Sequence, residues 1–324
     1  MRECDYITNM IPGRRLIVGQ LFVLMVLVSS LGAAGSQEVG GEIPGQIAGA
    51  VTDSNRGVVP GATVTLDGRR LPAPRTTTSD ASGLFRFTGV TPGTYFLRVQ
   101  LRGFSTVTRE GVAVTTGGNV EGNVSLAIAS LVSKVTPPAS ALRAGEVGVD
   151  LETVHGDIYV AVDTERAPIT SANFLKYVDG GFYNLGRFHR VTRPDNYTPA
   201  PPNRPAMQII QAGPDPFRWR DTFPPIPLER TSVTGIKHVR GTLSMARGGP
   251  NTATADFVIL LDDQPSLDFG GMRFDDGQGG AAFGRVVSGL DVATKIQQEG
   301  PMRESNRQYL QVPLQILKAE RLKK

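Results

Sequence analysis

The chain has 324 residues, of which 40% are hydrophobic and 20% are charged, and its net charge is only +4. This charge is too small to indicate a nucleic acid or a membrane surface as the partner. One cysteine and three histidines, with no pair at metal-ligand spacing, exclude a disulfide framework and leave no candidate metal site. We therefore predict a protein that needs no metal and no cofactor.

The first segment of the chain, residues 1–35, predicts an export signal. Arg14 and Arg15 precede the apolar run LIVGQLFVLMVLV, and small residues suited to cleavage follow in SSLGAAGS. Cleavage near Ala33 would leave about 290 residues, a length typical of two domains. The prediction places the mature protein in the periplasm or outside the cell. An uncleaved anchor helix is the alternative, although the apolar run is short for a membrane span.

Residues 46–130 predict a small β-sandwich. The runs QIAGAVTD, GATVTLDG, GLFRFTGV, GTYFLRVQ and NVEGNVSLAI alternate or are β-branched, and turn signals separate them. The stretches GAVTDSNRGVVPGATVTL and TTSDASGLFRFTGVTPGTYFLRVQLRGF resemble the carboxypeptidase regulatory-like, transthyretin-like domain. The resemblance implies a non-catalytic accessory module. It could be a spacer that helps folding, or a surface that contacts cell-envelope material.

A linker is predicted at residues 131–146, where Pro137 and Pro138 stiffen the chain and prevent strand pairing. The second domain, residues 147–320, begins with VGVDLETVHGDIYVAVD. This pattern predicts a hairpin of two alternating strands that turns at His155.

Two helices are predicted in the second domain. TERAPITSANFLKYVDGG has Thr164 or a neighbour as its cap, Pro168 in its first turn and Gly180 at its end. SGLDVATKIQQEG predicts a second helix from Ser288 to Gly300. Short β runs lie between them, so we expect a mainly β fold in which a closed barrel carries helices over its ends.

Four blocks of the second domain resemble the cyclophilins, a family of peptidyl-prolyl cis-trans isomerases. They are GDIYVAVDTERAPITSANFLKYVDGGFYNLGRFHRV, IIQAG, GTLSMARGGPNTATADFVI and AAFGRVVSGLDVATKI, in the family's order. The resemblance implies an eight-stranded antiparallel barrel capped by two helices. It also implies a substrate that is an X-Pro peptide bond in an unfolded or extended polypeptide.

Rotation about an X-Pro bond needs no nucleophile and no metal, because no bond is made or broken. The barrier is ~20 kcal/mol, and a millionfold acceleration removes roughly 8 kcal/mol of it. A fixed cationic donor can stabilise the twisted amide more than the planar one. Arg190, in the block FHR, matches the family's catalytic arginine. Phe188 and His189 beside it are expected to support the substrate site by packing.

The resemblance also assigns residues that hold the substrate. Gln211 would hydrogen-bond the substrate backbone, and the rim strand that contacts the substrate main chain would hold Ala246, Arg247 and Gly248. Arg247 stands in place of the usual asparagine. The apolar pocket for the proline ring would be formed by Ile209, Val258, Leu267 and Phe283.

Several positions depart from the family's pattern and predict a shallower, less aromatic pocket. Gln208 stands where the family has phenylalanine, and Asp256 stands where it has glutamine. Ser266 and Gly280 replace tryptophan and histidine, and an extended loop, DFGGMRFDDGQGGA, lies between them.

Two other functions therefore stay open at the level of sequence. The chain could be a weakly catalytic or non-catalytic proline-binding chaperone or scaffold, or a cell-envelope binding protein. A further hypothesis concerns the loop VTRPDNYTPAPPNRPAMQII, which holds five prolines and could visit the proline pocket of its own or a neighbouring molecule.

Overall fold

The computed structural model describes residues 42–128, 141–196 and 206–322. The predicted signal peptide at 1–35, residues 131–140 of the predicted linker, and the prolines from Pro199 to Pro205 lie outside these residues. None of the helices in the described ranges is long and apolar enough to cross a membrane.

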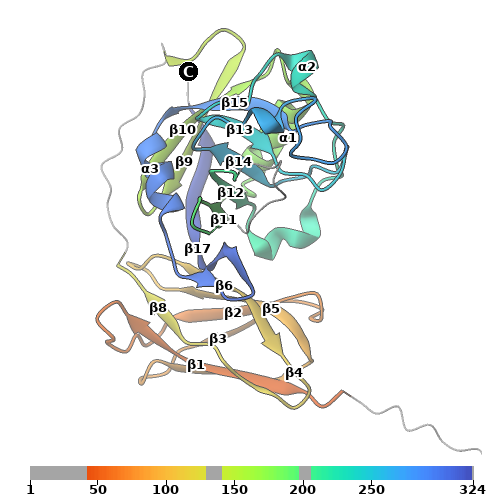
Figure 1. The fold of residues 1–324 in the computed structure, drawn as a ribbon. Coiled ribbons are helices and arrows are strands. Elements are labelled where there is room, and N and C mark those ends of the chain that lie inside the picture. Colours follow the sequence, from red (N-terminus) through yellow and green to blue (C-terminus); the bar gives the residue numbers. More distant parts are fainter. Residues whose placement is uncertain (1–41, 129–140, 197–205, 323–324) are drawn as a thin grey trace, which may run out of the picture. The chain divides into compact units, whose positions relative to one another are not determined.

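The N-terminal part consists of two four-stranded sheets, as predicted for a sandwich (Figure 1). One sheet has the order β4-β1-β7, with β8 also paired to β1, and the other has the order β3-β2-β5-β6. The strands are β1 (Gly45–Asp53), β2 (Thr63–Asp67), β3 (Arg75–Thr78), β4 (Leu84–Val90), β5 (Gly93–Gln100), β6 (Val107–Val114), β7 (Asn119–Glu121) and β8 (Val124–Leu126).

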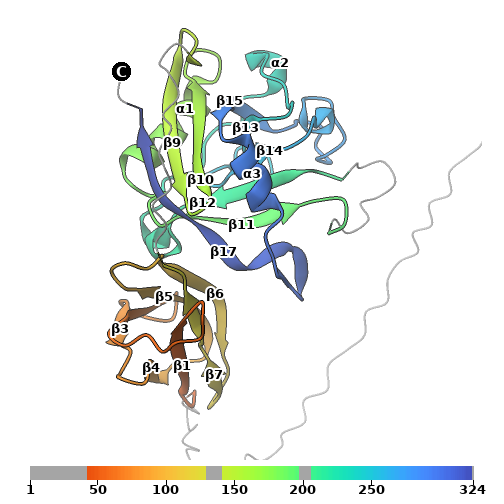
Figure 2. The same ribbon diagram turned by 90° about the vertical axis from the view of Figure 1, so that its left-hand side faces the viewer.

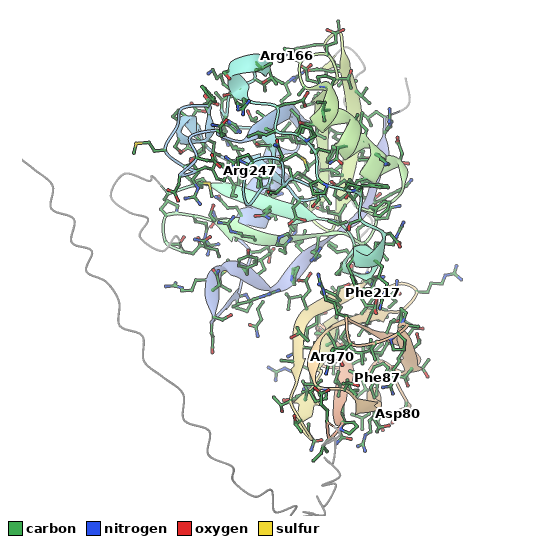
Figure 3. The ribbon with its side chains drawn as sticks, turned by 90° about the vertical axis from the view of Figure 1, so that its right-hand side faces the viewer. Arg70, Asp80, Phe87, Arg166, Phe217 and Arg247 are labelled. Carbon is green, nitrogen blue, oxygen red and sulfur yellow. The ribbon has the colours of Figure 1, made fainter. Side chains whose placement is uncertain are left out.

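Alternation along the strands creates a core inside this sandwich. In β4, Phe85 and Phe87 are buried while the side chains between and before them are exposed. They join Ile47, Tyr95 and Leu97 in one apolar cluster. Figure 3 shows the side chains of this part, with Phe87 labelled. The sandwich thus has a hydrophobic core of its own.

The second part is an antiparallel barrel, which confirms the predicted fold (Figure 2). Within the described residues, eight strands follow the order β11-β12-β14-β13-β15-β10-β9-β17, and pairing of β17 with β11 closes the ring. They are β9 (Glu146–Thr153), β10 (Gly156–Asp163), β11 (Arg187–Thr192), β12 (Ile209–Gly213), β13 (Thr242–Met245), β14 (Phe257–Leu260), β15 (Ala281–Ser288) and β17 (Asn306–Arg321). A short strand, β16 (Met302–Arg303), pairs with the start of β17.

The predicted hairpin is formed by β9 and β10, which turn at Val154 and His155. Both predicted helices are present as α1 (Pro168–Asp179) and α3 (Leu290–Gln297). The described residues also include α2 (Thr231–Thr234) and two 3₁₀ helices, η2 (Pro216–Asp221) and η3 (Pro265–Leu267).

The start of α1 differs from the prediction that the side chain of Thr164 or a neighbour caps it, because no side chain at the N-cap accepts a hydrogen bond. The N-cap residue is Ala167, and Thr164 instead donates its hydroxyl to the Gly145 carbonyl at 2.7 Å. The carboxylate of Glu229 accepts from the backbone N–H groups of Ile169 and Thr170, at 3.1 and 2.7 Å. A distant side chain therefore satisfies the free donors of the first turn.

The second helix is shorter than the predicted range from Ser288 to Gly300. Gly289 precedes it with a φ of 87°, and a Cβ at this position would lie 2.2 Å from the Asp157 carbonyl oxygen. Only glycine can adopt this backbone so close to β10, which is why α3 begins at Leu290.

Aromatic rings join α1 to the barrel interior. Phe174 of α1 lies 5.2 Å, centroid to centroid, from both Phe257 and Phe283 and 5.4 Å from Tyr183. All four side chains are fully buried. The barrel is therefore a packed core, and a ligand site must lie on its outer surface.

Candidate active site

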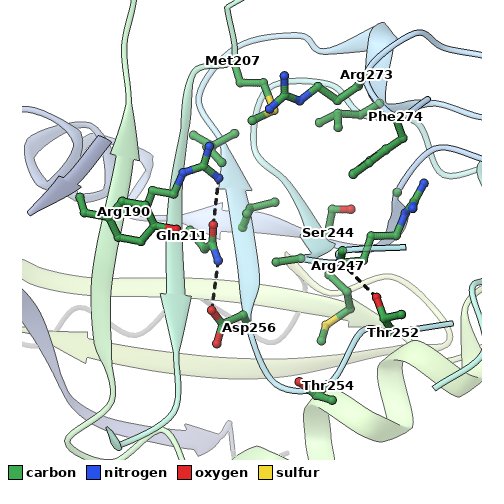
Figure 4. A pocket seen from close by; sticks show the side chains of 18 residues that line it. Arg190, Met207, Gln211, Ser244, Arg247, Thr252, Thr254, Asp256, Arg273 and Phe274 are labelled. Carbon is green, nitrogen blue, oxygen red and sulfur yellow. Dashed lines mark hydrogen bonds between the residues drawn. The ribbon is translucent and has the colours of Figure 1, made fainter. Parts of the chain in front are cut away.

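A cavity of about 420 Å³ opens on the barrel surface beside β11, β12 and β14 (Figure 4). It brings together eight of the residues predicted from sequence: Arg190, Ile209, Gln211, Ala246, Arg247, Gly248, Val258 and Leu267. Met207, Asp256, Phe274 and Tyr309 also line it. The structure therefore gathers residues that lie up to 119 positions apart in the chain, from Arg190 to Tyr309.

Arg190 on β11 faces Gln211, its register partner on β12. Its Nη1 donates to Gln211 Oε1 at 3.1 Å, and its Nε and Nη2 donate to Gln308 Oε1 at 3.1 and 2.6 Å. Gln211 Nε2 in turn donates to the Asp256 carboxylate at 3.0 Å (Figure 4). Two amide oxygens thus hold the guanidinium at the cavity edge, and Asp256 sets which way the Gln211 amide points.

His189 supports this arrangement from behind the cavity wall. Its ring stacks on Tyr309 with centroids 6.0 Å apart, and its Nε2 lies 3.4 Å from Asp256 Oδ2. Burial lowers the pKa of His189, although the Asp256 carboxylate acts in the opposite direction. The imidazole is therefore neutral near pH 7.

The apolar wall contains Ile209, Val258 and Leu267, as expected, but also two residues that the prediction missed. Met207 is buried in the same cluster, and Phe274 packs against it. Gln208, which was matched to a pocket phenylalanine, points away and donates to Asp262 at 3.0 Å. Since side chains alternate along an extended chain, Met207 and Ile209 share a face, and this alternation was the signal that could have identified Met207.

The sequence of this chain matches two known protein families. The model of the cyclophilin type peptidyl-prolyl cis-trans isomerase family matches residues 148–321. The chain belongs to the cyclophilin-type peptidyl-prolyl cis-trans isomerases. The model of the carboxypeptidase regulatory-like domain matches residues 46–127.

Curated relatives agree with this family. The chain is 37% identical over 150 residues to peptidyl-prolyl cis-trans isomerase A of Dickeya dadantii, covering 46% of this chain and 70% of that protein. It is 38% identical over 151 residues to peptidyl-prolyl cis-trans isomerase B of Escherichia coli, covering 46% and 83%. A crystal structure of a Cryptosporidium parvum cyclophilin type isomerase aligns with 55% of this chain and 99% of its own, at 20% identity and a TM-score of 0.42. The protein is a peptidyl-prolyl isomerase.

Phe188, which was expected to support the site by packing, and Phe283, which was expected in the proline pocket, lie away from the cavity of this cyclophilin-type domain. Phe188 and Phe283 are both fully buried in the barrel core, and neither lines the pocket. Phe283 packs on Phe174 instead. The strand that carries each residue turns that side chain inward, so the prediction that Phe283 contacts the proline ring is corrected.

Arg247 lies at the cyclophilin rim, but its side chain is only 1% exposed. Its Nε donates to the Gly279 carbonyl at 2.8 Å, and its two terminal nitrogens bind Asp276 at 2.7 and 2.8 Å. The guanidinium also lies 3.6 Å from the centroid of the Phe274 ring. The side chain therefore holds the loop that follows η3.

Among the described residues, no group of three or more histidine, cysteine, aspartate or glutamate side chains is placed to hold an ion. The site offers the fixed guanidinium cation of Arg190, the oriented amide of Gln211 and an apolar cavity.

Proposed function

We propose that Arg190 lowers the rotation barrier in this isomerase, and that the chain is exported and acts on extended, proline-containing segments of folding proteins. The observation that carries the proposal is the position of the Arg190 guanidinium, held by Gln211 and Gln308 at the edge of an apolar cavity. A proline ring in the hollow would bring its amide nitrogen to this edge.

The chemistry follows from the loss of conjugation as the amide twists. The nitrogen lone pair localises in the twisted state and becomes a better hydrogen-bond acceptor, and a fixed guanidinium stabilises it more than the planar amide. Gln211 and Gln308 hold the guanidinium before substrate binds, so little reorganisation is needed. Arginine keeps its charge and offers a planar fork of donors, which lysine lacks.

Substitution of Arg190 tests this role. We expect Arg190→Ala to lower kcat/KM for an X-Pro peptide by about 100-fold or more, as for the loss of one preorganised donor. Arg190→Lys should recover only part of the rate, because the fork is lost. Arg321→Ala, which removes an exposed ion pair on β17, serves as the matched control and should change the rate less than about twofold. An Arg190→Ala protein as active as the wild type would refute the role.

Export is supported by the order of basic, apolar and small residues in segment 1–35. Expression in a bacterial host, followed by mass measurement of the protein in each cell fraction, tests it. We expect a mature chain that lacks about 35 residues, located in the periplasm or the medium. An intact chain in the membrane fraction would support the anchor helix instead.

Contact with the cell envelope is the proposed role of the β-sandwich. Its support is the match of residues 46–127 to the carboxypeptidase regulatory-like domain, together with a hydrophobic core formed by residues of the sandwich itself.

A further inference from the structure

The long loop between η3 and β15 forms part of the cavity wall. Its backbone is tied by hydrogen bonds from Arg273 N to the Ser266 carbonyl at 3.0 Å and from Gly280 N to the Leu267 carbonyl at 2.8 Å. A third bond, from Gly270 N to the Gly277 carbonyl at 2.8 Å, crosses the loop itself. These bonds give the loop one defined path along the cavity.

Phe274 is the residue that this loop contributes to the apolar wall. It packs against the cluster that includes Met207, Ile209 and Leu267, and it lines the cavity. Figure 4 shows its ring across the cavity from Arg190. Tyr309 of β17 is the other aromatic residue in the cavity lining, whereas the cluster that Phe274 joins is otherwise aliphatic or methionine. Grooves that bind proline usually present aromatic faces. Phe274 supplies such a face.

Arg247 fixes the position of the Phe274 ring. The guanidinium stacks at 3.6 Å from the ring centroid while its nitrogens bind Asp276 and the Gly279 carbonyl. One buried side chain of the rim therefore ties the loop at three residues. The Arg247 contact lowers the pKa of Asp276 to about 2, so the ion pair persists throughout the neutral range.

We propose that Phe274 is a specificity-determining residue that packs on the proline ring of the substrate, and that Arg247 is the positioning residue that holds the Phe274 ring at the cavity. The proposal rests on the proposed function of the Arg190 cavity. It assigns to the loop between η3 and β15 the aromatic ring that the apolar cluster of Met207, Ile209, Val258 and Leu267 lacks.

Kinetic parameters of the mature chain test the role of Phe274. We expect Phe274→Ala to raise KM for an X-Pro peptide about tenfold with little change in kcat, because the ring binds the substrate without touching the twisting amide. Phe274→Trp should retain a KM close to that of the wild type. Met272→Ala, an exposed residue of the same loop, is the control and should leave both parameters unchanged.

A double-mutant cycle tests the role of Arg247. Arg247→Met alone should raise KM, but it should have little further effect in the Phe274→Ala background, since Arg247 acts through that ring. Equal effects in both backgrounds would overturn the positioning role. If Arg247→Met does not fold, Arg247→Lys, which keeps the charge but loses the bidentate fork, is used in the same cycle.

The outcomes separate this inference from the proposed function. A wild type whose activity depends on Arg190, together with an unchanged KM in Phe274→Ala, refutes the inference alone. A wild type insensitive to Arg190→Ala refutes the proposed function, whatever Phe274 does.

Discussion

At the scale of single residues, the site depends on a chain of oriented polar groups. Arg190 donates to Gln211, Gln211 donates to Asp256, and Asp256 lies beside the buried His189. The sequence identified Arg190 and Gln211 because each lies in a short cyclophilin-like block, FHR for Arg190 and IIQAG for Gln211. It could not identify Gln308, because that residue reaches Arg190 only after β17 has closed the barrel.

The protonation of His189 gives a prediction for stability against pH. Because the pKa of His189 in the folded state is lowered by burial, the unfolded chain binds this proton more readily. The stability from neutral His189 is complete above its ordinary pKa of about 6.5 and falls as the pH drops below it. Denaturant unfolding at pH 7.5 and 5.5 should show this loss in the wild type and a smaller loss in His189→Gln. Equal losses would contradict the assignment.

At the scale of elements, the sequence predicted the ends of helix α1 correctly, because these ends depend on residues next to them in the chain. Pro168 starts α1 and Gly180 ends it, as predicted. The predicted cap, a side chain at Thr164 or a neighbour, is replaced by the carboxylate of Glu229, about 60 residues away, which no local pattern reveals. Phe274 was missed for the same reason, since the inserted loop has no strand or helix period that points its ring inward.

Removal of the Glu229 carboxylate should weaken α1. We expect Glu229→Ala to lower the free energy of unfolding by about 1 kcal/mol, as for the loss of an N-terminal cap. Glu229→Gln keeps one acceptor oxygen and should lose less. Thr164→Ala, at the position predicted from sequence, should not release the first-turn N–H groups of α1. Equilibrium denaturation with urea measures all three, and a Glu229→Ala protein as stable as the wild type would contradict the capping role.

At the scale of the whole molecule, the chain combines two folds with separate hydrophobic cores. Alternation and turn signals predicted the sandwich, and two helices among short β runs, together with the four cyclophilin-like blocks, predicted the barrel. The face of the barrel that carries the site depends on which side chains turn outward, and this assignment failed for Phe283. Every residue that lines the cavity belongs to the barrel.

A chain that begins at residue 141 should therefore keep kcat/KM for a short X-Pro peptide within about twofold of the mature protein. The same chain should lose co-sedimentation with purified cell envelopes if the sandwich makes that contact. A large fall in activity towards the short peptide would show that the site requires the sandwich. Unchanged co-sedimentation would refute the proposed envelope role.

The most direct measurement of the central claim is exchange NMR on an X-Pro peptide with a small amount of the mature protein, because it reports binding and cis–trans exchange separately. The account predicts that the wild type accelerates exchange, whereas Arg190→Ala still binds the peptide but loses most of the acceleration. Exchange that is equally fast with Arg190→Ala, at equal binding, would contradict the claim that this guanidinium stabilises the twisted amide.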